Sequence, residues 1–101
     1  MEKQSFDNVW DALTDTPAES ANMTARSDLL LALQRTIGDW GLTQEAAAKR
    51  LGITRPRIND LLAGKISKFS LDALVNLAAG AGLAVEIHTS ERLDELTAAS
   101  R

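Results

Sequence analysis

The sequence predicts an all-α domain, with four to six helices around one core and a single β-strand near the C-terminus. Three observations indicate this fold. Three Thr or Ser residues each precede a stretch with helical spacing of apolar residues, a glycine follows each stretch, and the spacing changes to strict alternation only near the C-terminus. A chain of 101 residues has room for one core and not for two.

The first predicted element is a short amphipathic helix, for which Ser5 is a candidate cap. Its apolar residues recur at helical spacing and are Phe6, Val9, Trp10 and Leu13. A helix of so few turns is not stable alone in water. We therefore expect its apolar face either to pack on this domain or on a second copy, or to contact a different protein.

The second predicted element is a long helix that runs toward Trp40. Thr16 and Glu19 form a capping box with a proline at the first helical position, and Gly41 suits the residue after the helix. Thr24 offers a second start, so the sequence leaves open a break near residue 23. The apolar face of this helix is expected to carry Ala21, Ala25, Leu29, Leu33, Ile37 and Trp40.

Three shorter helices are predicted next, each with a hydroxyl residue before it and a glycine after it. The candidate caps are Thr43, Thr54 and Ser70. The first helix is expected over 44–51 and ends at Gly52. The second runs from residue 55 toward Gly64, and the third is expected over 71–79 and ends at Gly80.

A single strand is predicted over residues 83–89. Leu83, Val85 and Ile87 alternate with smaller or polar residues, as in a half-buried strand. An unpaired strand exposes a row of backbone donors and acceptors, so the simplest arrangement is a two-fold dimer in which this strand pairs antiparallel with its copy. The alternative is an extended tail that covers the core.

Residues 42–61 match a helix-turn-helix pattern, with Gly52 at the turn. The residues expected to pack inward are Ala47, Leu51, Ile53, Ile58 and Leu61. The side chains left at the start or on the outer face of the second helix, where it would enter the major groove of DNA, are Arg55, Pro56, Arg57, Asn59 and Asp60.

Charge is distributed unevenly along the chain, whose net charge is −3. Residues 49–68 carry six basic side chains and one acidic one, whereas residues 1–22 carry one basic and five acidic. A basic centre between acidic ends indicates a polyanion-binding surface; the alternative is an ordinary solvated face. We expect three parts: an acidic arm over 1–22, the helix-turn-helix domain over 23–80, and a dimerisation strand and tail over 81–101.

Over about residues 25–80 the chain resembles the Cro/repressor-like (XRE) family of DNA-binding domains. The matching features are Leu-Thr-Gln at 42–44, the small Ala48, the central Gly52, Ile-Thr at 53–54 and Gly-Lys at 64–65. More narrowly, RINDLLAGK at 57–65, FSLDAL at 69–74 and GLAVEI at 82–87 resemble antitoxins of HigA type. Such antitoxins pair with RelE/HigB-like ribonuclease toxins and repress their own operon, so the resemblance implies the same partner and activity here. The possible toxin contacts are then the apolar residues near the N-terminus, Phe6, Val9, Trp10 and Leu13.

Candidate base contacts follow from side-chain chemistry. Arg55 suits a bidentate contact with guanine, and Arg57 suits either guanine or a phosphate. Asn59 suits adenine or the backbone, and Asp60 suits the amino group of cytosine or a neighbouring arginine. Pro56 offers only an apolar contact, such as one to a thymine methyl group.

Candidate phosphate contacts lie at helix starts and in the loop after the second helix. The resemblance places Gln44 on a phosphate, and the N–H groups at the same helix start form an anion site. The full set of expected phosphate contacts is Thr43, Gln44, Thr54, Lys65, Lys68 and Ser70.

Catalysis and cofactor binding have no support in the sequence, so we expect neither an enzyme nor a small-molecule ligand. The chain has no cysteine and one histidine, His88, which excludes a thiolate site and a paired-histidine metal site. No segment is apolar enough to span a membrane, and the N-terminus lacks a signal-peptide core, so we expect a cytoplasmic protein.

The sequence therefore predicts a repressor that binds a palindromic operator in double-stranded DNA as a homodimer, and the resemblance adds an antitoxin role. Two alternatives remain open. One is a stand-alone or phage-type regulator with no toxin. The other is a protein-interaction module that has kept the fold and lost DNA binding.

Overall fold

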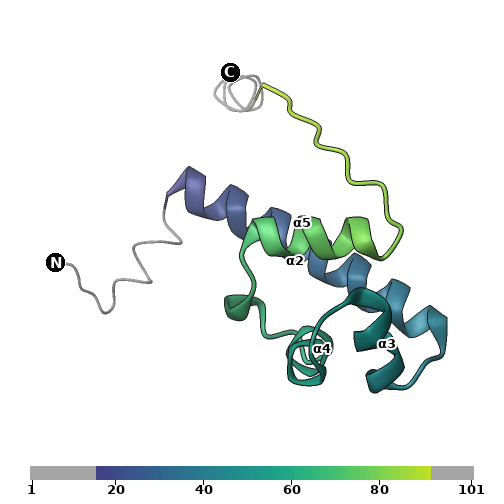
Figure 1. Cartoon of the computed structure of the whole chain (residues 1–101). Helices are drawn as coiled ribbons and strands as arrows, with labels where there is room; N and C mark the ends of the chain where they lie inside the picture. Colours follow the sequence, from purple (N-terminus) through teal and green to yellow (C-terminus); the bar gives the residue numbers. More distant parts are fainter. Residues whose placement is uncertain (1–15, 92–101) are drawn as a thin grey trace, which may run out of the picture.

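The computed structural model describes residues 16–91, which form four α-helices and one short 3-10 helix (Figure 1). The elements in order are α2 (Pro17–Trp40), α3 (Gln44–Leu51), α4 (Arg55–Leu62), η1 (Ile66–Lys68) and α5 (Leu71–Gly80). α5 packs along α2, α3 packs against α4, and both α4 and η1 contact α2. The predicted helical architecture is confirmed, and none of these helices is long and apolar enough to cross a membrane.

The long helix α2 is continuous and begins where the capping box predicts. The Thr16 hydroxyl accepts a hydrogen bond of 3.0 Å from the Glu19 N–H, and Gly41 ends the helix in the left-handed region at φ +65°. There is no break near residue 23, and the predicted boundary between residues 22 and 23 falls inside α2. The fully buried stripe of α2 is Leu30, Leu33 and Ile37, whereas Ala21 of the predicted face is exposed.

The three predicted hydroxyl caps are all present. Thr43, Thr54 and Ser70 each accept the backbone N–H of the residue three positions later, at distances of 3.1, 3.2 and 3.1 Å. Gly52 takes the left-handed conformation that ends α3, at φ +72°. The prediction that Gly80 ends α5 is wrong. Gly80 is still helical, and the glycine with a positive φ that turns the chain is Gly82, two residues later.

One hydrophobic core lies where α2, the α3–α4 pair and α5 meet. Ala47 and Ala48 of α3 are small enough for α4 to approach closely, and both are buried. The buried core comprises Leu30, Leu33, Ile37, Ala47, Ala48, Ile58, Leu61, Phe69, Leu74, Leu77 and Ala78. The inward packing predicted for the helix-turn-helix residues is confirmed, with Leu51 and Ile53 partly buried at its edge.

The segment after α5 differs from the prediction. No strand is present among residues 16–91; residues 83–91 run away from α5 without regular structure (Figure 1). Leu83 and Val85 pack against the core, but Ile87 is 82% exposed. A strand requires a neighbour for its backbone hydrogen bonds, and the described part of a single chain provides none. The predicted N-terminal helix with its aromatic stripe lies outside the described residues.

Candidate nucleic-acid interface

The start of α4 presents most of the residues predicted to contact DNA bases. The hydrogen bond from the Arg57 N–H to the Thr54 hydroxyl fixes where the helix begins, and Arg55 and Pro56 occupy its first two positions. Arg55, Pro56 and Asn59 are exposed. Within residues 16–91 the guanidinium of Arg55 forms no hydrogen bond or ion pair. Its donors are therefore available to an external acceptor.

Arg57, the other predicted guanine reader, is engaged inside the protein. Its guanidinium carbon lies 4.0 Å from the centre of the Phe69 ring, and Nη1 donates a hydrogen bond of 2.8 Å to the Lys68 carbonyl. Phe69 is fully buried, so Arg57 covers a core residue and connects α4 to the segment before α5. Arg50 stacks in the same way on Trp40, at 4.0 Å.

Asp60 forms a cluster with the two loop lysines predicted to contact phosphates. Its carboxylate oxygens lie 3.6 Å from Lys65 Nζ and 3.8 Å from Lys68 Nζ. The Asp60 carbonyl also accepts a hydrogen bond of 3.0 Å from the Lys65 N–H. The two lysine side chains are 52% and 56% exposed and that of Asp60 is 20% exposed, so the ammonium groups remain open to solvent while the carboxylate is partly covered.

The remaining predicted phosphate contacts sit at three helix starts. Thr43, Thr54 and Ser70 accept backbone N–H groups as caps, which leaves each hydroxyl hydrogen able to donate to a phosphate oxygen. Gln44 opens α3 and is partly buried. The first N–H groups of α3 and α5 have no partner within their own helices, and such groups bind anions.

Two polar residues of α2 support this surface, and the sequence analysis did not identify them. Gln34 Nε2 donates to the carbonyls of Leu61 and Leu62, both at 3.2 Å, and so satisfies the C-terminal end of α4. Arg26 Nη1 donates to the carbonyls of Ile66 and Phe69, at 3.5 and 3.3 Å. These bonds hold α4 and the loop that carries Lys65 and Lys68 on α2.

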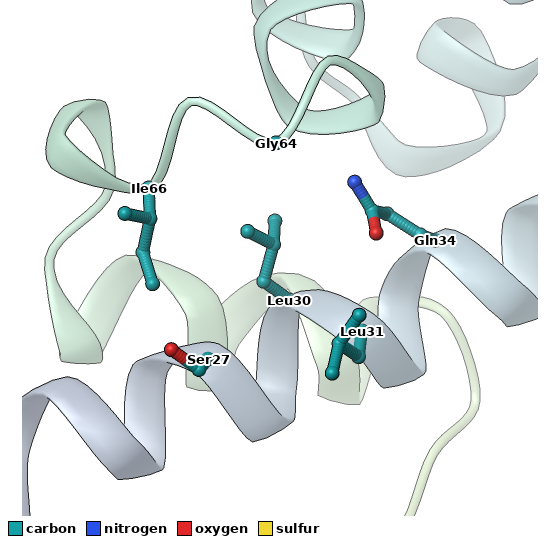
Figure 2. A pocket seen from close by; sticks show the side chains of 6 residues that line it. All are labelled: Ser27, Leu30, Leu31, Gln34, Gly64 and Ile66. Atoms are coloured by element: carbon teal, nitrogen blue, oxygen red, sulfur yellow. The ribbon is translucent and has the colours of Figure 1, made fainter.

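A shallow hollow of about 340 Å³ lies between α2 and the loop after α4 (Figure 2). Gln34 and Gly64 border it, and a Cβ placed on Gly64 would lie 3.6 Å from Gln34 Nε2. Figure 2 shows the amide nitrogen of Gln34 directed toward the chain at Gly64 rather than into the hollow. Leu30, Leu31 and Ile66 supply an apolar lining, so the hollow carries no set of converging polar groups.

A larger groove of about 980 Å³ separates the α2–α5 pair from the segment after α5. Its walls include Leu29 of α2, Val75 of α5 and the three residues predicted to form the dimer strand, Leu83, Val85 and Ile87. His88 Nε2 lies 3.3 Å from Glu86 Oε1 on this segment. No group of three metal-ligating side chains occurs within residues 16–91.

Comparison with known proteins agrees with this geometry. A family profile described as a helix-turn-helix domain matches residues 12–90. The chain is also similar to a solved structure named as an XRE-family transcriptional regulator, with 32% sequence identity and a TM-score of 0.65 over 73% of this chain and 85% of that one. No curated protein sequence matches. The chain therefore belongs to the XRE helix-turn-helix family.

Proposed function

We propose that this protein is a sequence-specific DNA-binding transcriptional regulator that acts without catalysis. The observation that carries the proposal is the unpaired, exposed guanidinium of Arg55 at the first position of α4, a helix that Arg57 bonds to the loop carrying Lys65 and Lys68. Such a helix enters the major groove with its N-terminal residues toward the bases. Arg55 would read guanine, and exposed Asn59 and Pro56 would contact neighbouring bases.

The phosphate contacts would come from both sides of α4. Lys65, Lys68 and the Ser70 hydroxyl would bind one stretch of backbone, and Gln44 with the Thr43 hydroxyl would bind another. Phosphate contacts fix register and orientation but carry no sequence information. In this proposal selectivity therefore depends on the few exposed side chains at the start of α4.

A gel-shift and footprinting experiment on the gene's own upstream region tests the proposal. We expect a salt-dependent shift, a protected palindrome with half-sites about 34–36 Å apart, and much weaker binding to a scrambled duplex. Arg55→Ala should cost about 1–3 kcal/mol on the operator and relax selectivity at one base position. Equal affinity for operator and scrambled DNA would contradict the proposal. Absence of any shift would favour the protein-interaction module.

The proposed homodimer uses the segment after α5. The backbone of residues 84–91 forms no hydrogen bond with other backbone groups of the described chain. In an antiparallel pair centred on Val85, Leu83 would lie opposite Ile87 of the second copy, and all three apolar residues would share one face. A register centred on Glu86 would instead place two carboxylates opposite each other, which is unfavourable.

Single-cysteine variants test this register, because the native chain has no cysteine. Val85→Cys should form a covalent dimer under mild oxidation, since the residue would face its own copy. Ala84→Cys, which would face Glu86 of the second copy, is the matched control and should cross-link far less. Equal cross-linking of both variants, or a monomer by sedimentation, would refute the strand dimer.

An antitoxin role is the narrower form of the proposal. Its support is the resemblance of residues 57–65, 69–74 and 82–87 to HigA-type antitoxins, together with the acidic, aromatic-bearing residues 1–15. An acidic segment with Phe6 and Trp10 would complement a basic RNA-binding cleft in a RelE/HigB-like toxin. Co-expression with the product of the adjacent gene decides this point: a stable complex supports the antitoxin, and two separate proteins indicate a stand-alone regulator.

A further inference from the structure

Asp60 is the one acidic residue within the basic stretch 49–68, so it places a negative charge among the residues predicted to contact DNA. It lies on α4, one position after exposed Asn59, yet its own side chain is only 20% exposed. Both of its carboxylate oxygens face lysine ammonium groups, at 3.6 and 3.8 Å. A carboxylate held in this way is poorly placed to accept a hydrogen bond from a base.

The backbone around the cluster is fixed by further contacts. The Lys65 N–H donates to the Asp60 carbonyl at 3.0 Å, and the Lys68 carbonyl accepts from Arg57 at 2.8 Å. The backbone positions of the two lysines are therefore set by bonds to α4. Their half-exposed ammonium groups can still turn toward a phosphate, because an exposed ion pair holds its partners only weakly.

We infer that Asp60 competes with DNA phosphates for Lys65 and Lys68, which lowers affinity for DNA of any sequence. This inference rests on the proposed function. The three side chains together carry one net positive charge instead of two. Sequence-independent binding arises from phosphate neutralisation, whereas recognition by Arg55 does not depend on these lysines. Asp60 therefore lowers sequence-independent affinity and makes base contacts a larger share of the binding free energy, without itself contacting a base.

The test compares Asp60→Asn with the wild-type full chain on two fluorescent duplexes, the promoter fragment and a scrambled duplex of equal composition, between 50 and 300 mM KCl. Asp60→Asn should bind the scrambled duplex about 3- to 10-fold more tightly at the lowest salt, with a salt slope steeper by up to about 0.9. Operator affinity should rise by a similar factor, because the lysines would contact phosphates in both complexes, so the ratio of the two affinities should not change. Asp28→Asn is the matched control, because it removes the same charge from an exposed site on α2 that lines the other groove.

A double-mutant cycle separates this role from a structural one. In the Lys65→Gln/Lys68→Gln background, Asp60→Asn should change scrambled-duplex affinity no more than Asp28→Asn does. A reader of cytosine would behave differently, because Asp60→Asn would then weaken operator binding and leave the scrambled duplex unchanged. That result, or an Asp60→Asn effect equal to that of Asp28→Asn, overturns the inference.

The wild-type measurements report on the proposed function independently. Equal wild-type affinity for the two duplexes rejects sequence-specific regulation, while the Asp60→Asn effect on the scrambled duplex still decides whether Asp60 restrains the lysines. A wild-type chain that binds neither duplex rejects both. Circular dichroism of each variant identifies any loss of binding caused by unfolding, and if Asp60→Asn unfolds, Asp60→Ala takes its place in the same comparison.

Discussion

Replacing Arg57 by alanine is expected to destabilise the protein, although the sequence places this residue among the DNA contacts. The substitution removes the guanidinium stacked on Phe69 and the 2.8 Å bond to the Lys68 carbonyl. A partly exposed cation–π contact contributes about 0.5–1 kcal/mol, and the hydrogen bond contributes about 1 kcal/mol. The sum, about 1.5–2 kcal/mol, corresponds to a fall in Tm of roughly 10 °C for a domain of this size.

Arg55→Ala is the matched control, because it removes the same side chain two residues earlier. Within the described chain that guanidinium forms no hydrogen bond or ion pair, so its loss should change the free energy of unfolding by less than about 0.5 kcal/mol. Arg57→Lys should recover only part of the lost stability, since an ammonium lacks the planar group that stacks on a ring. Thermal unfolding followed by circular dichroism gives all three values.

A structural role for Arg57 is refuted if Arg57→Ala melts within about 2 °C of the wild type, or if Arg55→Ala melts as low as Arg57→Ala. Binding data give a second check at temperatures where every variant is folded. Arg55→Ala should lose discrimination between operator and scrambled DNA, whereas Arg57→Ala should lower both affinities together, because it loosens the loop that carries the lysines.

Three further outcomes follow from the same contacts. Gln34→Ala leaves the Leu61 and Leu62 carbonyls without their side-chain donor and should cost about 1–3 kcal/mol in urea unfolding; an unchanged midpoint would show that water replaces the amide. Gly52→Ala should cost about 1–2 kcal/mol from backbone strain at φ +72° alone, because its Cβ would meet no atom within 4 Å; a neutral result in the same assay would exclude that strain. Lys65→Ala should weaken binding to all duplexes alike and reduce the salt slope by about 0.9, as measured by fluorescence anisotropy; a loss confined to the operator would make Lys65 a base reader.

The helix boundaries and most of the core were predictable from the sequence, because the signals are local. A Thr or Ser cap acts on the N–H three residues later, and the glycines after α2 and α3 turn the chain within one residue of the helix end. Helical spacing likewise selects Leu33 and Ile37 without knowledge of their partners. Leu30 was missed because the buried stripe of α2 is rotated relative to the predicted face.

The sequence did not allow us to predict which polar side chains contact the rest of the protein and which remain free for a ligand. Arg55 and Arg57 look alike in sequence, and only the position of Phe69, twelve residues after Arg57, distinguishes them. The bonds from Gln34 to α4 join residues 27 and 28 positions apart, and no local pattern reports such a pairing. The strand prediction failed for a related reason, since a strand is a property of two segments and the described chain holds one.

The internal pairing of the basic residues explains how an acidic chain can be suited to selective DNA binding. Of the arginines within 50–57, two are stacked on aromatic rings and one is unpaired; the two loop lysines share a carboxylate. Each unpaired cation adds affinity for any duplex, while discrimination grows only with contacts to bases. A surface that leaves one guanidinium at the tip of α4 and restrains the neighbouring cations lowers affinity for every duplex, so contacts to bases make up a larger share of the binding free energy. The whole chain carries a net charge of −3, so the residues outside 49–68 add no general attraction to DNA that would offset this restraint.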